Sequence, residues 1–307
     1  MSEMSDKFLP NEFFFNKTMK EKIIHELSDK CDQLIKSKNY VEAIECCKKS
    51  IQLEENNPII YYQWGQICFN LAQINENEAL YTESFEKFEK ATIICEDFAE
   101  AYFGWGLALS YLANIKEDEK LFRKSYKKFE KAIKINENFE KAYFQWGYAL
   151  SSLAIIKGDE KLFIEACRKY AKAMQLELNT TDAFATYTFW GTTLSYLAIL
   201  KPSESLFREA IEKFNNAIEY NHKIQNPLVL ANTFNYRGIA YIHLANLKKE
   251  EFIFDQTLYR NAIDNFKEAI NLSKAKADFY FNLGCAQASY GEVKFYLILC
   301  SERKIIN

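Results

Sequence analysis

The 307-residue sequence is poor in glycine, proline and histidine, with 9 Gly, 4 Pro and 3 His. So few glycines and prolines leave too few turn residues for an all-β protein. The histidines, His25, His222 and His243, form no HExxH-like arrangement, so we expect neither a metal site nor histidine-based catalysis. The 8 cysteines show no CxxC spacing, which favours buried thiols over a metal or redox centre.

Long hydrophobic runs and an excess of positive charge are also absent. No stretch approaches the roughly eighteen apolar residues that a membrane span requires, and residues 1–22 hold Glu3, Asp6 and Glu12 instead of a signal-peptide core. The net charge is −3 and the pI about 5.9, which disfavours nucleic acid as a partner. We therefore expect a cytoplasmic protein with reduced thiols. Its abundant Lys, Asn, Ile, Glu and Tyr are typical of an AT-rich bacterial genome.

The most informative feature that is present is a recurring Trp-Gly pair. Hydrophobic residues make up 49% of the chain and aromatic residues 16%, enough for a continuous core. A period of tens of residues predicts stacked units, each of which buries its apolar face against the next. The pairs are Trp64-Gly65, Trp105-Gly106, Trp146-Gly147 and Trp190-Gly191.

Alignment of the units on these glycines gives two blocks that are repeated in each unit. In the first block, apolar residues such as Tyr102, Trp105, Leu109 and Leu112 recur at helical spacing. In the second, an aromatic residue stands four positions after a small residue and three before an alanine. Two antiparallel helices per unit follow. The second-block aromatic residues are Phe88, Phe129, Tyr170 and Phe214.

A third repeated element lies between the two blocks. Asn77, Asp118, Asp159 and Ser203 occupy one equivalent position, where a side-chain oxygen can cap the second helix. A glutamate follows each cap, at the positive end of the helix dipole. Lysines end the preceding helix in three of the units. The sequence therefore predicts the same capped turn four times.

These residues resemble the tetratricopeptide repeat, in which a large residue, Gly, a small residue, an aromatic residue and Ala stand at fixed offsets. In that family the glycine lies twelve residues before the small residue of the second helix. Here Gly106 to Ser125 and Gly147 to Ala166 span nineteen. The seven extra residues at the turn predict that both helices are extended there by about one turn.

The resemblance covers nearly the whole chain and implies an all-α, right-handed α-solenoid of helix-turn-helix repeats. We expect an N-terminal extension over residues 1–23 and a solenoid over 24–307. In the first unit Cys31 replaces the glycine, and Ala43, Cys47 and Ser50 form the second-helix set. The expected units are about 24–57, 58–98, 99–139, 140–183, 184–230, 231–276 and a partial unit, 277–307.

Several features have a structural interpretation. The glycines are expected to allow close helix packing, and the tryptophans to make buried contacts between units. The apolar segment Phe295–Cys300 could pack back on the last unit, form an interface or continue into a longer protein. The run Phe13–Phe15 precedes the expected first helix and should be buried, so it or the C-terminal tail could fill part of the binding surface.

In tetratricopeptide proteins the first helices line a concave groove, and equivalent residues form columns along it. The columns here are aromatic, apolar or neutral, without the Lys and Asn that chaperone-binding members use to hold a peptide carboxylate. They suit an apolar segment of a partner. One column is Tyr62, Phe103, Phe144, Thr188, Asn235 and Phe281; the next is Gln66, Leu107, Tyr148, Thr192 and Ile239; the third is Asn70, Tyr111, Ser152, Tyr196 and His243.

The sequence thus predicts a non-catalytic scaffold without a cofactor, which binds a protein or peptide in an uncharged, aromatic-rich groove. One alternative is a module that self-assembles into homo-oligomers through its apolar chain ends. Another is a sensor or regulatory subunit of a larger enzyme system. Repeat folds host unrelated functions, so the partner itself is not predicted.

Overall fold

The computed structural model describes residues 10–176, 180–221, 226–251 and 253–306, and every regular element in these ranges is an α-helix. The helices are α1 (Pro10–Lys36), α2 (Tyr40–Leu53), α3 (Pro58–Asn75), α4 (Glu78–Ile94), α5 (Ala99–Lys116), α6 (Glu119–Ile135), α7 (Glu140–Lys157), α8 (Glu160–Met174), α9 (Thr180–Leu200), α10 (Glu204–Asn221), α11 (Pro227–Glu250), α12 (Gln256–Leu272) and α13 (Ala277–Ile306).

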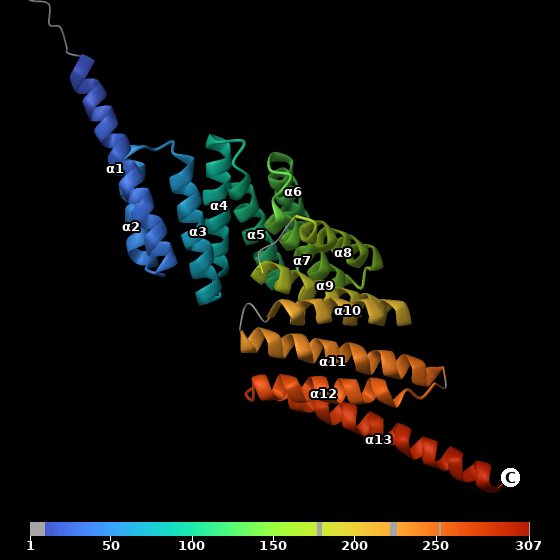
Figure 1. The fold of residues 1–307 in the computed structure, drawn as a ribbon. Coiled ribbons are helices and arrows are strands. Elements are labelled where there is room, and N and C mark those ends of the chain that lie inside the picture. The colour runs from blue at the N-terminus through green and yellow to red at the C-terminus, as the bar shows by residue number, and fades with distance from the viewer. Residues whose placement is uncertain (1–9, 177–179, 222–225, 252, 307) are drawn as a thin grey trace, which may run out of the picture. The chain divides into compact units, whose positions relative to one another are not determined.

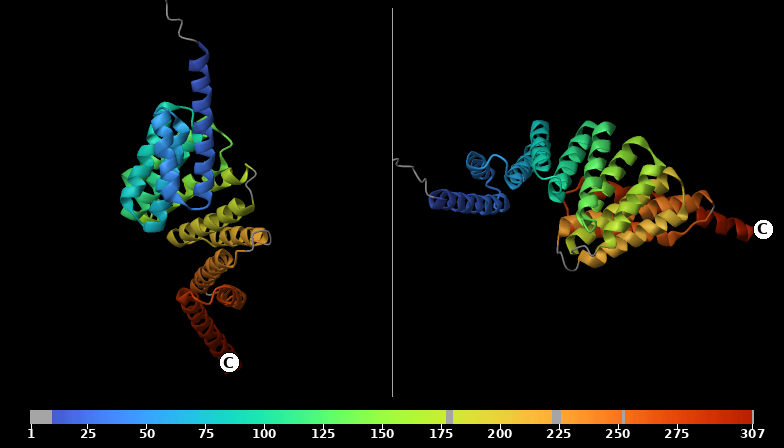
Figure 2. Two further views of the ribbon diagram at one scale, coloured as in Figure 1. Left: turned by 90° about the vertical axis from the view of Figure 1, so that its left-hand side faces the viewer. Right: turned by 90° about the horizontal axis from the view of Figure 1, so that it is seen from above.

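The chain divides into two compact units, residues 1–137 with α1–α6 and residues 138–307 with α7–α13. Within each unit, consecutive helices pack as pairs, such as α3 with α4 and α11 with α12 (Figures 1 and 2). The second helix of a pair also packs against the first helix of the next pair in the same unit, as α4 does against α5. The predicted all-α array of helix-turn-helix pairs is confirmed.

The glycine of each Trp-Gly pair lies beneath an aromatic ring of its partner helix. A Cβ atom built on Gly106 would come within 2.8 Å of the Phe129 ring, and one on Gly147 within 2.9 Å of Tyr170. A side chain at either position would displace the ring, which explains why glycine is tolerated inside the helix. The expected packing role is confirmed. The same contact joins Gly65 to Phe88, Gly191 to Phe214 and Gly238 to Phe266.

The first pair makes the equivalent contact with two cysteines. Cys31 occupies the glycine position and Cys47 the aromatic position, with their Sγ atoms 3.6 Å apart. Both are buried. A larger residue on one helix therefore compensates for a smaller one on the other. The hydrogen bond with Cys31 and burial together raise the pKa of the Cys47 thiol.

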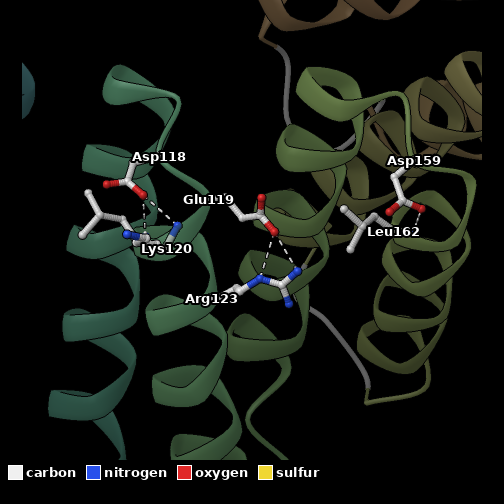
Figure 3. Close-up of polar contacts among 7 residues, drawn as sticks. Asp118, Glu119, Lys120, Arg123, Asp159 and Leu162 are labelled. Carbon is white, nitrogen blue, oxygen red and sulfur yellow. Dashed lines mark hydrogen bonds and ion pairs between the residues drawn. The ribbon is translucent and has the colours of Figure 1, made fainter.

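The capped turns form as predicted. The Asp118 carboxylate accepts hydrogen bonds from the backbone N–H groups of Lys120 (2.7 Å) and Leu121 (3.3 Å), and Asp159 caps α8 in the same way (Figure 3). Asn77 and Ser203 accept equivalent bonds at α4 and α10. α4 and α6 have 17 residues each against 14 for α2 of the ordinary-length first pair, which confirms the extension of the second helices.

The charges at these turns also join neighbouring pairs. Lys116 at the end of α5 lies 2.8 Å from Glu78 at the start of α4. Equivalent ion pairs link Lys201 to Glu160 (2.9 Å) and Lys248 to Glu204 (3.3 Å). Their side chains are partly exposed, so each pair contributes less than about 1 kcal/mol. The ion pairs bring the ends of α5, α9 and α11 to the starts of α4, α8 and α10.

The expectation of buried tryptophans was only partly right. Trp64 and Trp105 pack against the apolar clusters of the preceding pairs, but both indoles are half-buried. The other face of each ring lies under a lysine of the partner helix, with Lys128 Nζ 3.1 Å from the Trp105 centroid. Such contacts are worth about 0.5–1 kcal/mol at exposed sites. The other pairs are Lys87 over Trp64 (4.3 Å), Lys169 over Trp146 (3.4 Å) and Lys213 over Trp190 (4.6 Å).

Helix boundaries differ from the expected ones in three places. α1 begins at Pro10, so residues 10–23 belong to the first helix; the side chains of Phe13–Phe15 lie outside the described part. α9 and α11 begin at Thr180 and Pro227, four residues before the expected units. The early start of α11 arises because Asn226 caps it and proline suits its first turn.

α13 continues as one helix through the apolar segment at 295–300. It packs against the preceding pair through Phe279, Val293 and Leu297, which supports the expectation that this end packs on the last complete unit. The Phe295 side chain remains 61% exposed.

Candidate binding face of the first helices

The residues predicted to bind a partner share one side of the first helices. They stand three positions before the motif glycine, one after it and five after it. At about 100° per residue these positions fall within an arc of about 80°. In the N-terminal unit the face is formed by α3 and α5, and in the C-terminal unit by α7, α9 and α11. Each unit contains a cavity lined by residues of this face.

The α3–α5 cavity has a volume of about 190 Å³, and no charged side chain lines it. Gln66 Nε2 donates a hydrogen bond to the Tyr62 hydroxyl (2.8 Å), and burial raises the pKa of Tyr62 to about 12. The phenol is therefore neutral. Four predicted residues, Tyr62, Gln66, Phe103 and Leu107, line this cavity, together with Phe69, Asn70, Phe88 and Gly104.

The α9–α11 cavity is larger, at about 240 Å³, and is mostly apolar. Tyr196 and Tyr236 are 42% and 39% exposed, so both phenol rings are open to a partner. His243 stacks on Phe207 with ring centroids 5.9 Å apart, and burial lowers the pKa of His243, which keeps the imidazole neutral at pH 7. The lining consists of Thr192, Ser195, Tyr196, Ile199, Phe214, Tyr236, Ile239 and His243.

Three predicted aromatic residues support the face without lining either cavity. Phe144 and Tyr148 are half-buried and contact Phe189, with ring centroids 5.8 and 5.2 Å apart. Tyr111 packs edge-on against Phe69 at 5.3 Å. Part of the surface of each of these rings is therefore covered by another ring of the same unit.

Thr188 and Asn235 are buried, at 7% exposure each. Thr188 Oγ1 lies 3.2 Å from Thr233 Oγ1 of α11, and Asn235 Oδ1 accepts a hydrogen bond from Asn282 of α13 at 2.9 Å. The position three before the glycine faces the next first helix, so a short polar side chain there is covered. Thr188 therefore links α9 to α11, and Asn235 links α11 to α13.

Sequence reasoning missed the position two before the glycine. At 100° per residue it lies beside the position five after the glycine, and therefore on the same face. Tyr236 and Phe189, 39% and 38% exposed, occupy it in α11 and α9. Gly104 occupies it in α5, where it opens the α3–α5 cavity. Adding this column to the helical projection would have identified all three.

The described residues contain no group of three or more His, Cys, Asp or Glu placed to hold a metal ion. Within the same residues, no helix combines the length and apolar character needed to cross a bilayer. The two cavities hold apolar rings and neutral hydroxyl, amide and imidazole groups. Such a lining can bury an apolar side chain and hydrogen-bond to a peptide backbone.

No family model and no curated protein matches the chain. Among solved structures, it is similar to MamA (20% identity, TM-score 0.47, 66% of this chain and 94% of that one). A second is YrrB, described as a TPR protein with an unusual peptide-binding site (18% identity, TM-score 0.47, 76% of this chain and 96% of that one). A third is MamA 41-end from Desulfovibrio magneticus RS-1 (16% identity, TM-score 0.48, 66% of this chain and 96% of that one). Similarities this low do not transfer a function to this chain.

Proposed function

We propose that this array of tetratricopeptide-like helix pairs is a non-catalytic binding protein that holds an apolar segment of a partner on its first-helix face. The observation that best supports the proposal is the α9–α11 cavity, where two open tyrosine rings, Tyr196 and Tyr236, border an uncharged hollow of about 240 Å³. Exposed aromatic rings beside a preformed apolar cavity are typical of binding hot spots.

Binding would rest on one or more bulky apolar side chains entering these cavities. In the α9–α11 cavity, Ile199, Phe214 and Ile239 line the hollow together with the tyrosines and would contact such a side chain. The phenol hydroxyls and Thr192 provide neutral hydrogen-bonding groups for the partner's backbone. The α3–α5 cavity offers a second anchoring point within the N-terminal unit.

The test is selection of random displayed peptides on the immobilised full-length chain, followed by affinity measurement with a labelled peptide. We expect enrichment of bulky apolar residues and at least about tenfold weaker binding to the Tyr196→Glu/Tyr236→Glu variant. Tyr280→Glu is the matched control, because Tyr280 is 49% exposed on α13 and lines neither cavity. Equal binding by the wild type and the double variant would refute the proposal.

A second candidate, self-association through α13, is favoured by two exposed rings on that helix. Phe281 and Phe295 are 71% and 61% exposed, and a Cβ atom built on Gly284 between them would meet nothing within 4 Å. If copies associate through this surface, the sedimentation coefficient should rise with concentration, and Phe281→Asp/Phe295→Asp should abolish the rise. A concentration-independent monomer would eliminate this candidate.

A further inference from the structure

The second helix of the third pair is basic, although the chain as a whole is not. Over Glu119–Ile135, α6 has seven Lys or Arg residues and two Glu. Both glutamates already lie in ion pairs, Glu119 with Arg123 and Glu130 with Lys134. Lys124 and Lys127 are exposed and have no carboxylate within 4 Å among the described residues. The overall charge of −3 hides this concentration of positive charge.

Alignment of the longer second helices shows that two surface positions are both basic in α6 but not in α4, α8 or α10. The position just before the small residue and the position two after it are Glu83 and Glu86 in α4, Glu165 and Arg168 in α8, and Glu209 and Glu212 in α10. In α6 they are Lys124 and Lys127. Both are surface positions outside the helix interface, so packing does not require lysine there. The inversion of charge at two positions indicates a local role.

These lysines border a cavity of about 440 Å³, which lies within the N-terminal unit. Its apolar wall is built from Phe85, Trp105, Leu109 and Leu121, and its charged rim from Lys124, Lys127, Lys128 and Glu89. Three ammonium groups against one carboxylate leave the rim positive.

The cavity is separate from the proposed binding face. Trp105 and Leu109 stand about 200° around α5 from Phe103 and Leu107, which line the α3–α5 cavity. Residues on opposite sides of one helix cannot share a ligand of peptide width. The apolar wall and the positive rim therefore define a second site.

We propose that this basic pocket binds an acidic peptide segment, in which Asp or Glu residues flank a bulky apolar side chain. The apolar side chain would rest against Phe85 and Leu121 of the pocket wall, and the carboxylates would pair with Lys124 and Lys127. Lys128 is held over the Trp105 ring, 3.1 Å from its centroid, so it adds positive potential at a fixed place. Charge complementarity of this kind sets specificity and association rate.

The features of the site favour a peptide over other anionic ligands. A membrane surface would require exposed apolar residues on α6, but Phe122 and Phe129 are buried against the neighbouring helices. Nucleic acid would require an extended basic surface, whereas the adjacent α4 has four Glu and two Lys. Glu89 on the rim would also repel a phosphate backbone.

The probe is a labelled synthetic peptide with four Asp or Glu residues around a central Phe-Leu, compared with its Asn/Gln isostere by fluorescence anisotropy on the full chain. We expect the acidic peptide to bind at least tenfold more tightly than the isostere. Lys124→Glu/Lys127→Glu should weaken binding at least tenfold, because it installs the residues that α4 has at these positions. Preferential binding of the isostere or unchanged binding by this variant would overturn the proposal.

Lys120→Glu/Lys161→Glu is the matched control, because it makes the same change in net charge at two exposed lysines outside the pocket. It should change the affinity less than twofold. Phosphatidylserine vesicles and single-stranded DNA are tested in parallel. The proposal would be overturned if the acidic peptide did not bind and either the vesicles or the DNA bound in a way that required Lys124 and Lys127. Tyr196→Glu/Tyr236→Glu should bind the acidic peptide normally, so failure of the proposed function is distinguishable.

Discussion

The matched glycines Gly106 and Gly284 give the sharpest test of how the helix pairs are held together. Each is the eighth residue of its helix, α5 or α13. A Cβ atom at Gly106 would lie 2.8 Å from two Phe129 ring atoms and 3.2 Å from a third, whereas one at Gly284 would meet nothing within 4 Å. Alanine should therefore have opposite effects at the two positions.

The expected magnitudes follow from two opposing contributions. Replacing an interior helical glycine by alanine gains about 1 kcal/mol in either helix. At Gly106 the ring must also move by roughly 0.6 Å in a close-packed environment. Phe129 is 0% exposed, so the cost should lie in the upper part of the usual overpacking range of about 1–3 kcal/mol. Gly106→Ala should be net destabilising by about 1–2 kcal/mol, and Gly284→Ala stabilising by up to about 1 kcal/mol.

Thermal melting followed by circular dichroism measures the first effect, and amide hydrogen exchange within α13 measures the second. The exchange readout is needed because terminal repeats can unfold separately from the rest of an array. Gly106→Ala should lower the Tm by a few degrees, while Gly284→Ala should slow exchange in α13. If Gly106→Ala left the melting temperature unchanged, or if both variants lost stability equally, the ring-on-glycine account would be wrong.

Three further predictions concern the turns, the half-buried His243 and the first pair. Glu117 has a left-handed φ of 51°, at the helix-end position where Gly158 has a φ of 62°. Glu117→Gly should therefore raise the free energy of unfolding by up to about 1 kcal/mol in urea titrations; a loss of stability would contradict this. Burial lowers the His243 pKa below 6.5. As the pH falls, the unfolded chain therefore binds a proton at this histidine before the folded chain does, and the free energy of unfolding should decrease below pH 6.5. Melting temperatures measured across this pH range should fall less in His243→Gln than in the wild type. Identical pH profiles for the two proteins would exclude the effect. Cys47→Phe alone should be destabilising by about 1–3 kcal/mol. Cys31→Gly/Cys47→Phe creates the ring-on-glycine contact of the other pairs and should recover stability in a double-mutant cycle. Strictly additive effects of the two substitutions would contradict this compensation.

The repeat framework could be predicted from the sequence because its determinants are local and repeated. A capping side chain such as Asp118 bonds to amides two and three residues away, so spacing alone identifies it. The glycines recur at constant offsets inside predicted helices, which predicted close helix packing there, and the structure shows that the ring of Phe129 is what meets Gly106. The compensating Cys31–Cys47 contact was visible as two departures from the pattern, but their pairing needed the structure.

The surface features were harder to predict because they depend on several helices at once. The tryptophans appeared buried from their position beside the glycine, but each is covered by a lysine twenty-three residues later on the partner helix, as Lys128 covers Trp105. Thr188 and Asn235 lie in groove columns by register, yet neighbouring first helices cover them. The basic character of α6 was missed because net charge was taken over the whole chain.

The central claim is that a partner's apolar side chain enters the α9–α11 cavity. The most direct measurement replaces Tyr196 with the photocrosslinker benzoylphenylalanine, irradiates the full chain with a peptide selected on the wild type, and locates the adduct by mass spectrometry. We expect a crosslink from position 196 to a bulky apolar residue of the peptide, and none from the same crosslinker at exposed Lys172 of α8. A crosslink from position 172 and none from position 196 would contradict it.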